Sequence, residues 1–212
     1  MTKAVSVAIA AFLFCCSICS AAIGQTVLTF DDLPKGSTGA SIPNGYGGLN
    51  WDGFNYEYWD LTNTGGSGYE YGSAGPGTGV AYKLADGISH ITSSNRFDFI
   101  GAYLTAAWRD GLQITATGYQ GSIPIYTQNV TVNSTSSTWF DFDFLNVDSL
   151  SFTASGGTVN PIYLTKFGLL GSLTQIVMDN FTFTPVPEPS TLALLALASL
   201  GLLVRRKFDF RP

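Results

Sequence analysis

Short runs of alternating apolar and polar residues, separated by turn dipeptides, dominate the sequence between residues 25 and 184. Residues 112–116, 140–144 and 150–152 each place apolar side chains at every second position. Such alternation is typical of a β-strand with one face in the core and one in water. Pairs that favour hairpin turns separate these runs, at 44–45, 52–53, 86–87, 110–111 and 156–157. No stretch of ten or more residues here has an apolar stripe of helical period, so the pattern predicts an all-β fold.

The length of this region is that of one domain with a full core. Residues 97–104 are mostly apolar and predict a central strand, while 27–30 and 176–183 predict the first and last strands. Nine or ten closely spaced strands favour a two-sheet antiparallel sandwich over residues 25–184, with a jelly roll as the expected topology. A closed up-and-down barrel is the alternative.

The C-terminal segment contains an uncharged apolar run that is followed by a basic cluster. Residues 192–204 include seven Leu and no charged residue. At about 1.5 Å per residue this run spans about 20 Å, which is shorter than the roughly 30 Å hydrocarbon core of a bilayer. Arg205, Arg206 and Lys207 follow, and their charges favour the cytoplasmic side. We therefore expect a membrane helix with its basic cluster at 192–207 and a tail at 208–212. A buried core helix is the alternative, but the run has no polar face.

A proline-rich stretch at 185–191 precedes this helix and is expected to be an extended linker. The order of Pro-Glu-Pro, apolar helix and basic end resembles the PEP-CTERM sorting signal of exopolysaccharide-producing bacteria. The resemblance implies processing by an exosortase and transient anchoring in the inner membrane through the C-terminal helix. It also implies a final location at the cell surface or in the extracellular matrix. The residues that carry it are Val186, Pro187, Glu188, Pro189, Arg205 and Arg206.

The N-terminus predicts export. Residues 1–24 combine Lys3, an apolar stretch and small residues before the expected cleavage point, as a secretory signal peptide does. All three cysteines lie inside it, so the mature chain has no thiol chemistry and no disulfide. Residues 25–184 carry thirteen acidic and five basic side chains, a formal charge of −8. A surface of this sign repels phosphates, which argues against a nucleic-acid partner.

Residues 46–71 are unusually rich in aromatic side chains interleaved with Gly, Asn, Asp and Glu. Sugars present flat C–H faces and rings of hydroxyls, which aromatic planes flanked by carboxylates can bind. This composition predicts a site for extracellular polysaccharide, and the alternative is that the rings fill the core beneath a long loop. The candidate ligand-binding residues are Trp51, Tyr56, Tyr58, Trp59 and Asp60.

A second resemblance covers most of the mature domain. The segments 43–51, 97–99, 102–108 and 177–181 are similar to those of a group of secreted β-rich bacterial and fungal proteins without an established activity. This resemblance implies an extracellular β-domain and no particular reaction.

Four oxygen-bearing side chains lie at the end of the first predicted strand or within the last: Asp31, Asp32, Asp179 and Asn180. If the terminal strands pair, as they often do in jelly rolls, these side chains converge on a candidate structural calcium site. Calcium takes six to eight oxygen ligands, and backbone carbonyls can complete the set. The alternative is a pair of surface turns, since adjacent strand residues point to opposite faces.

Catalytic motifs are not evident in the sequence. His90 is the single histidine and has no neighbouring Ser or Cys motif, and the Gly-rich stretch 75–79 lacks the Lys of a phosphate loop. We therefore expect a non-enzymatic cell-surface or matrix protein that binds glycan or is structural. One alternative is a carbohydrate-active enzyme, which needs two carboxylates facing one cleft. The other is a protein-binding adhesin, which would show a flat apolar patch.

Overall fold

The computed structural model describes residues 24–36, 39–60, 64–84, 87–168 and 173–186. The expected signal peptide and the expected C-terminal helix at 192–207 lie outside these residues, as do Pro187, Glu188, Pro189, Arg205 and Arg206. Within the described residues, no helix has the length and apolar character needed to cross a bilayer.

The described residues form nine strands and three short helical segments. The strands are β1 Thr26–Leu28, β2 Asn50–Asp52, β3 Phe54–Tyr58, β4 Gly79–Lys83, β5 Ser89–Ala106, β6 Arg109–Gln120, β7 Ile123–Val132, β8 Thr138–Val159 and β9 Ile176–Pro185. The helical segments are η1 Tyr46–Gly48, α2 Gly68–Gly72 and α3 Pro161–Phe167. Every strand pair is antiparallel, so the all-β prediction is confirmed.

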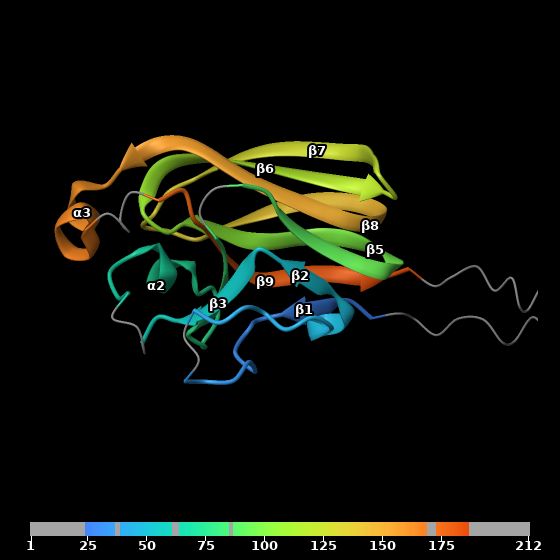
Figure 1. Cartoon of the computed structure of the whole chain (residues 1–212), viewed down its shortest axis with the longest axis horizontal. Coiled ribbons are helices and arrows are strands. Elements are labelled where there is room, and N and C mark those ends of the chain that lie inside the picture. Colours follow the sequence, from blue (N-terminus) through green and yellow to red (C-terminus); the bar gives the residue numbers. More distant parts are fainter. Residues whose placement is uncertain (1–23, 37–38, 61–63, 85–86, 169–172, 187–212) are drawn as a thin grey trace, which may run out of the picture.

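The strands follow the order β3-β4-β9-β5-β8-β6-β7 in one hydrogen-bonded sheet, with β1 on β9 and β2 on β5. The sheet folds over itself because β5 and β8, of 18 and 22 residues, are long and carry irregular registers. Figure 1 shows β6, β7 and β8 in one layer, and β1, β3 and β9 in the other. The sandwich-like arrangement is therefore confirmed, but its two layers belong to one continuous sheet rather than to two.

Strand β5 is central, as predicted, because it pairs with β8 on one side and β9 on the other. Phe97 and Phe99 point into the core, and so do Ala102 and Leu104 further along the strand. Strict alternation would place these two pairs on opposite faces. A register shift between Phe99 and Gly101 changes the face, which explains why the sequence looks apolar on both faces.

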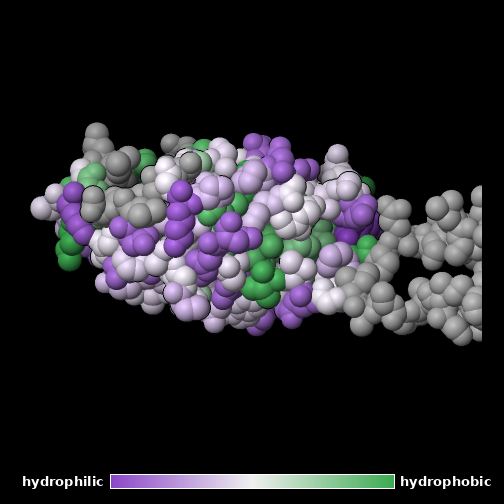
Figure 2. Space-filling view, turned by 90° about the horizontal axis from the view of Figure 1, so that it is seen from below, coloured by the Kyte–Doolittle hydropathy of each residue, from purple (hydrophilic) through white to green (hydrophobic). Residues whose placement is uncertain are grey.

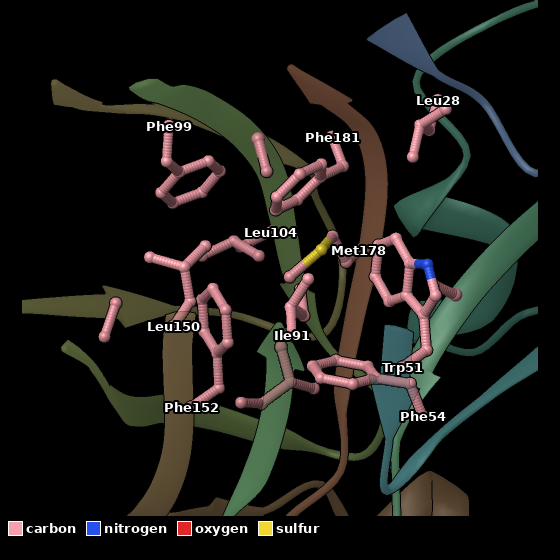
Figure 3. Close-up of a cluster of buried hydrophobic side chains, with 14 of the residues drawn as sticks. Leu28, Trp51, Phe54, Ile91, Phe99, Leu104, Leu150, Phe152, Met178 and Phe181 are labelled. Atoms are coloured by element: carbon pink, nitrogen blue, oxygen red, sulfur yellow. The ribbon is translucent and has the colours of Figure 1, made fainter. Parts of the chain in front are cut away.

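Aromatic rings from several strands fill the core. Phe99 is fully buried and stacks on Phe142 and Phe181, with ring centroids 4.9 and 4.7 Å away. Trp51 meets Phe54 and Phe181 edge-on at 5.6 and 5.4 Å. Figure 3 shows Phe99, Phe181 and Trp51 with Met178 among them, from strands far apart in sequence. The core therefore depends on contacts between distant segments.

The two terminal strands, β1 and β9, pair with each other. Thr26, Val27 and Leu28 lie opposite Phe183, Thr182 and Phe181. Strand β1 begins and β9 ends at one end of the domain, whereas α2 and α3 lie toward the other (Figure 1). The backbone N–H of Val186 donates to the carbonyl of Arg96 at 2.8 Å, which holds the chain where it leaves β9.

Candidate functional site

A second, smaller apolar cluster lies on the side of the sheet that faces away from the main core. We call this side the outer face; Tyr82, Val177 and Thr105 lie across from one another there on β4, β9 and β5. Tyr69 and Trp108 pack against each other in this cluster and both donate to the Gln175 Oε1, at 2.9 and 2.6 Å. The buried members of the cluster are Tyr69, Val80, Tyr82, Ala107, Trp108, Tyr163 and Val177.

Helix α2 covers this cluster and comes very close to the sheet. Ser67 caps its N-terminus, since the hydroxyl oxygen accepts from the Tyr69 N–H at 3.3 Å. The N–H of Gly68 donates to the Ala107 carbonyl at 3.0 Å, which joins the helix to the end of β5. A Cβ on Gly72 would lie only 2.6 Å from the Cγ1 of Val177, so glycine is required for this approach.

Two carboxylates hold the segment 73–79, which runs from the end of α2 to the first residue of β4, near its two ends. Asp179 accepts from the Ala74 N–H at 2.7 Å, and Asp31 accepts from the Gly79 N–H at 2.9 Å. A Cβ on Gly77 would lie 1.9 Å from the Asp31 Oδ1, far inside van der Waals contact, so the loop passes directly over that carboxylate. These contacts fix the backbone of the loop to β9 and to the turn after β1.

An open hollow of about 480 Å³ lies beside α2 and this loop, and we call it the α2 hollow. Tyr71 is 42% exposed there, and Trp59 and Glu70 are half-buried. Asp60 lies at its edge, because its Oδ1 accepts from the Thr78 hydroxyl at 3.2 Å. The lining residues are Trp59, Glu70, Tyr71, Ser73, Gly75, Pro76, Gly77 and Thr78. The hollow therefore combines two aromatic side chains with carboxylates and a hydroxyl.

Of the five candidate ligand-binding residues, three are buried in the core and two lie at the α2 hollow. Trp51, Tyr56 and Tyr58 are 4%, 3% and 0% exposed, so the expectation of exposed rings is wrong for these three. The Tyr58 hydroxyl instead donates to backbone carbonyls in the segment 30–33. Trp59 and Asp60 do lie at the α2 hollow.

The sequence analysis missed Glu70 as a binding candidate, together with the polar part of the loop. Tyr71 belongs to the aromatic segment 46–71 but is not one of the five candidate ligand-binding residues. The short helix α2 brings both residues to the hollow, and its signal in the sequence is Ser67, followed three residues later by Glu70.

The three aspartates among the metal candidates have hydrogen-bond partners of their own, and Asp31 lies near enough to Asp179 for their charges to interact. Asp31 and Asp179 bind the loop 73–79, whereas Asp32 accepts from the Tyr46 hydroxyl at 2.6 Å. Asn180 has a φ of 50°, a left-handed conformation that interrupts the regular backbone of β9. In the part of the chain that the structure describes, no group of three or more His, Cys, Asp or Glu could hold a metal ion.

Asp179 is nearly inaccessible to water, and burial raises the pKa of its carboxyl to about 6. The negative charge of Asp31 acts in the same direction. The N–H groups of Ala74 and Asn180 oppose this effect because they stabilise the carboxylate. Asp179 therefore titrates in a range where most aspartates are fully ionised.

Replacing Asp179 with Asn is expected to make the free energy of unfolding of the domain depend less on pH between about 4 and 6. The folded carboxyl binds a proton near pH 6 and the unfolded one near 3.8, so the folded state holds more protons in this window. Stability of the wild type then falls as the pH rises through it, by up to about 3 kcal/mol. The asparagine amide of the variant cannot ionise, so the stability of Asp179→Asn relative to the wild type should increase with pH. Urea unfolding at several pH values measures this difference, and parallel profiles would contradict it.

Several solved β-domain structures resemble this chain only in a general way. TmCBM61 in complex with beta-1,4-galactotriose is 8% identical, with 71% of this chain and 99% of that chain covered and a TM-score of 0.34. The K1 cleaved adhesin domain of Lys-gingipain from Porphyromonas gingivalis W83 is 7% identical, with 78% and 99% covered and a TM-score of 0.40. A CBM4 structure is 12% identical, with 63% and 86% covered and a TM-score of 0.27. Likenesses this distant say nothing of what the present chain binds.

No curated protein sequence matches the chain significantly. A family model does match its C-terminal part, at residues 185–207, where the sequence analysis places the Pro-Glu-Pro triplet, the apolar run and the basic cluster. This signal implies an exported protein. The chain thus carries the PEP-CTERM protein-sorting motif.

Proposed function

We propose that the chain is a non-enzymatic protein of the cell surface or extracellular matrix whose β-domain binds glycan at the α2 hollow. An exosortase processes it after transient anchoring in the inner membrane through residues 192–207, and the domain has a jelly-roll topology. The observation that carries the binding proposal is the pairing of Trp59 and Tyr71 with Asp60 and Glu70 around one open hollow. Aromatic planes pack against the C–H faces of sugars, and carboxylates accept hydrogen bonds from their hydroxyls.

The position of the hollow supports this function. Gly72, next to Tyr71, packs on Val177 near the start of β9, whereas Val186 follows the end of that strand. At about 3.3 Å per residue, the strand separates these two positions by about 30 Å. Helix α2, beside which the hollow lies, is therefore at the opposite end of the domain from Val186 (Figure 1), and an anchored domain meets external polymers at that far end.

Two observations favour binding over the alternatives. Asp60 and Glu70 both accept structural hydrogen bonds, from the Thr78 hydroxyl and from the Gly66 N–H, which favours a fixed binding role over acid–base chemistry. The face in Figure 2 is mostly white to purple, and its strongly hydrophobic areas are small and separate. A protein-binding adhesin would be expected to show a broad apolar patch instead.

Replacing Trp59 or Tyr71 with Ala is expected to weaken glycan binding about two- to twelvefold, because a lost aromatic contact is worth roughly 0.5–1.5 kcal/mol. Affinity electrophoresis of the full-length chain in detergent, through gels that contain soluble neutral polysaccharides, measures this change. Trp59 also packs against the smaller cluster, so its replacement can affect folding as well as binding. Tyr71 is more exposed, so Tyr71→Ala tests binding with less effect on folding.

Ile123→Ala is the matched control, because this side chain is 67% exposed on β7, outside the α2 hollow. Its retention should equal that of the wild type. If the wild type is not retarded by any polysaccharide, or if all variants behave alike, glycan binding at this hollow is wrong.

A further inference from the structure

A second aromatic pair lies on the outer face, away from the α2 hollow. Tyr103 of β5 and Trp139 of β8 meet at 5.3 Å between ring centroids, tilted by 65°, and both are half-buried. The indole lies over Gly101, where a Cβ would come within 2.6 Å of its Cζ2. The Trp139 Nε1 donates to the exposed Asp141 at 2.6 Å, which fixes the ring in place. This pair has the same composition as the hollow: two aromatic side chains beside a carboxylate.

The strand register places this pair on the same face as the hollow-lining loop. Asp179 lies opposite Tyr103, and Tyr103 lies opposite Trp139. Residues directly opposite in antiparallel strands project from the same face of a sheet. Asp179 in turn binds the Ala74 N–H, at the start of the loop 73–79. With strands about 4.8 Å apart, the Cα atoms of Asp179 and Trp139 are about 10 Å from each other.

Neither ring of this pair lies in the main core. On β5 and β8 the neighbouring positions Ala102, Leu104 and Phe142 point inward, whereas Tyr103 and Trp139 point outward. On the same face, α2 covers Val177 and Thr105 through Gly72. Thr105 is therefore fully buried on the outer face. Tyr103, the next residue on that face of β5, is only half-buried.

We propose that Tyr103 and Trp139 form a second subsite for the same glycan, so that the ligand is a neutral polysaccharide long enough to bridge both aromatic pairs. This inference rests on the glycan-binding function proposed above. Carboxylates flank both pairs, namely Asp60 and Glu70 at the hollow and Asp141 at the second subsite, and they repel polymers of uronic acids. Two linked subsites bind a polymer more tightly than a short oligosaccharide, because the second contact is intramolecular.

Replacing Trp139 with Ala tests this proposal. Affinity electrophoresis of the full-length chain uses galactomannan, xyloglucan and hydroxyethylcellulose as neutral polymers, and alginate as the anionic one. Titrations then use the disaccharide and the hexasaccharide of the neutral polymer that retards the wild type most. Trp139→Ala should weaken binding of the polymer at least tenfold and leave binding of the disaccharide unchanged, whereas Trp59→Ala should weaken both. Alginate should not retard the wild type.

Two further variants make the result unambiguous. Trp139→Thr places a β-branched residue, which favours strands, in β8. It should bind polymer and disaccharide as expected for a folded Trp139→Ala, and so tests the proposal if the alanine variant unfolds. Leu145→Ala, at a 54% exposed position of the same strand, should bind as the wild type does. The second subsite is wrong if the wild type binds polymer and disaccharide equally well, if the Trp139 variants bind the polymer normally, or if alginate binds best. A wild type that binds no polysaccharide would instead overturn the proposed function and this inference with it.

Discussion

Replacing Phe99 with Ala is expected to lower the free energy of unfolding by about 3–5 kcal/mol, the usual cost of removing a buried phenylalanine. Phe99 is 0% exposed and lies between two stacked rings, Phe142 of β8 and Phe181 of β9. It also meets Phe144 and Phe152 edge-on. Its loss opens a cavity at the centre of the sheet, and rigid strands on both sides prevent the cavity from closing.

Urea unfolding followed by tryptophan fluorescence measures this loss. Leu145→Ala, at an exposed position of β8, is the matched control and should change stability by less than about 0.5 kcal/mol. A Phe99→Ala protein within about 1 kcal/mol of the wild type would show that the stacked core does not hold the sheet together in this way.

Replacing Gly68 with Ala is expected to destabilise the domain by about 1–3 kcal/mol, and to displace α2. A Cβ at this position would lie 1.8 Å from the backbone oxygen of Ala106, so α2 must move away from β5. The hydrogen bond from the Gly68 N–H to the Ala107 carbonyl is then lost. Because Glu70 and Tyr71 belong to α2, the α2 hollow should change shape and glycan binding should weaken as well.

Near-UV circular dichroism detects the displacement of α2. Tyr69 of this helix packs against Trp108 with ring centroids 5.4 Å apart, and the signal of these rings changes if the helix moves. Gly65→Ala is the matched control: its Cβ would meet only the Glu70 carboxylate, at an ordinary 3.6 Å. If both alanine variants are equally stable and give the same near-UV spectrum, the close approach of α2 to β5 is wrong.

The strand pattern was largely predictable because it depends on local alternation. On β8, the predicted inward positions Phe142 and Phe144 are buried, and Asp141 and Asp143 are exposed. Strand β3 was harder, because it is covered on both sides: Tyr56 and Tyr58 are buried on one face and Glu57 on the other. Alternation disappears in such a strand, and aromatic composition alone cannot separate a core ring from a binding ring.

The candidate site was only partly predictable for the same reason. Trp59 lies one residue beyond Tyr58, yet it lines the hollow while Tyr58 is in the core. The difference arises where β3 ends and the chain turns toward α2. Glu70 and Tyr71 reach the same hollow only because α2 packs on β9 and β5, which are distant in sequence.

The sequence by itself determined the all-β class, the pairing-competent terminal strands and the PEP-CTERM motif, because each depends on residues close together in the chain. Only the tertiary structure decided which side chains share a surface. Asp31 and Asp179 bind the segment 73–79 and Asp32 binds Tyr46, while pairing of β9, β5 and β8 brings Asp179, Tyr103 and Trp139 into one row. Irregular residues and long-range strand registers set these positions, and neither has a periodic signal in the sequence.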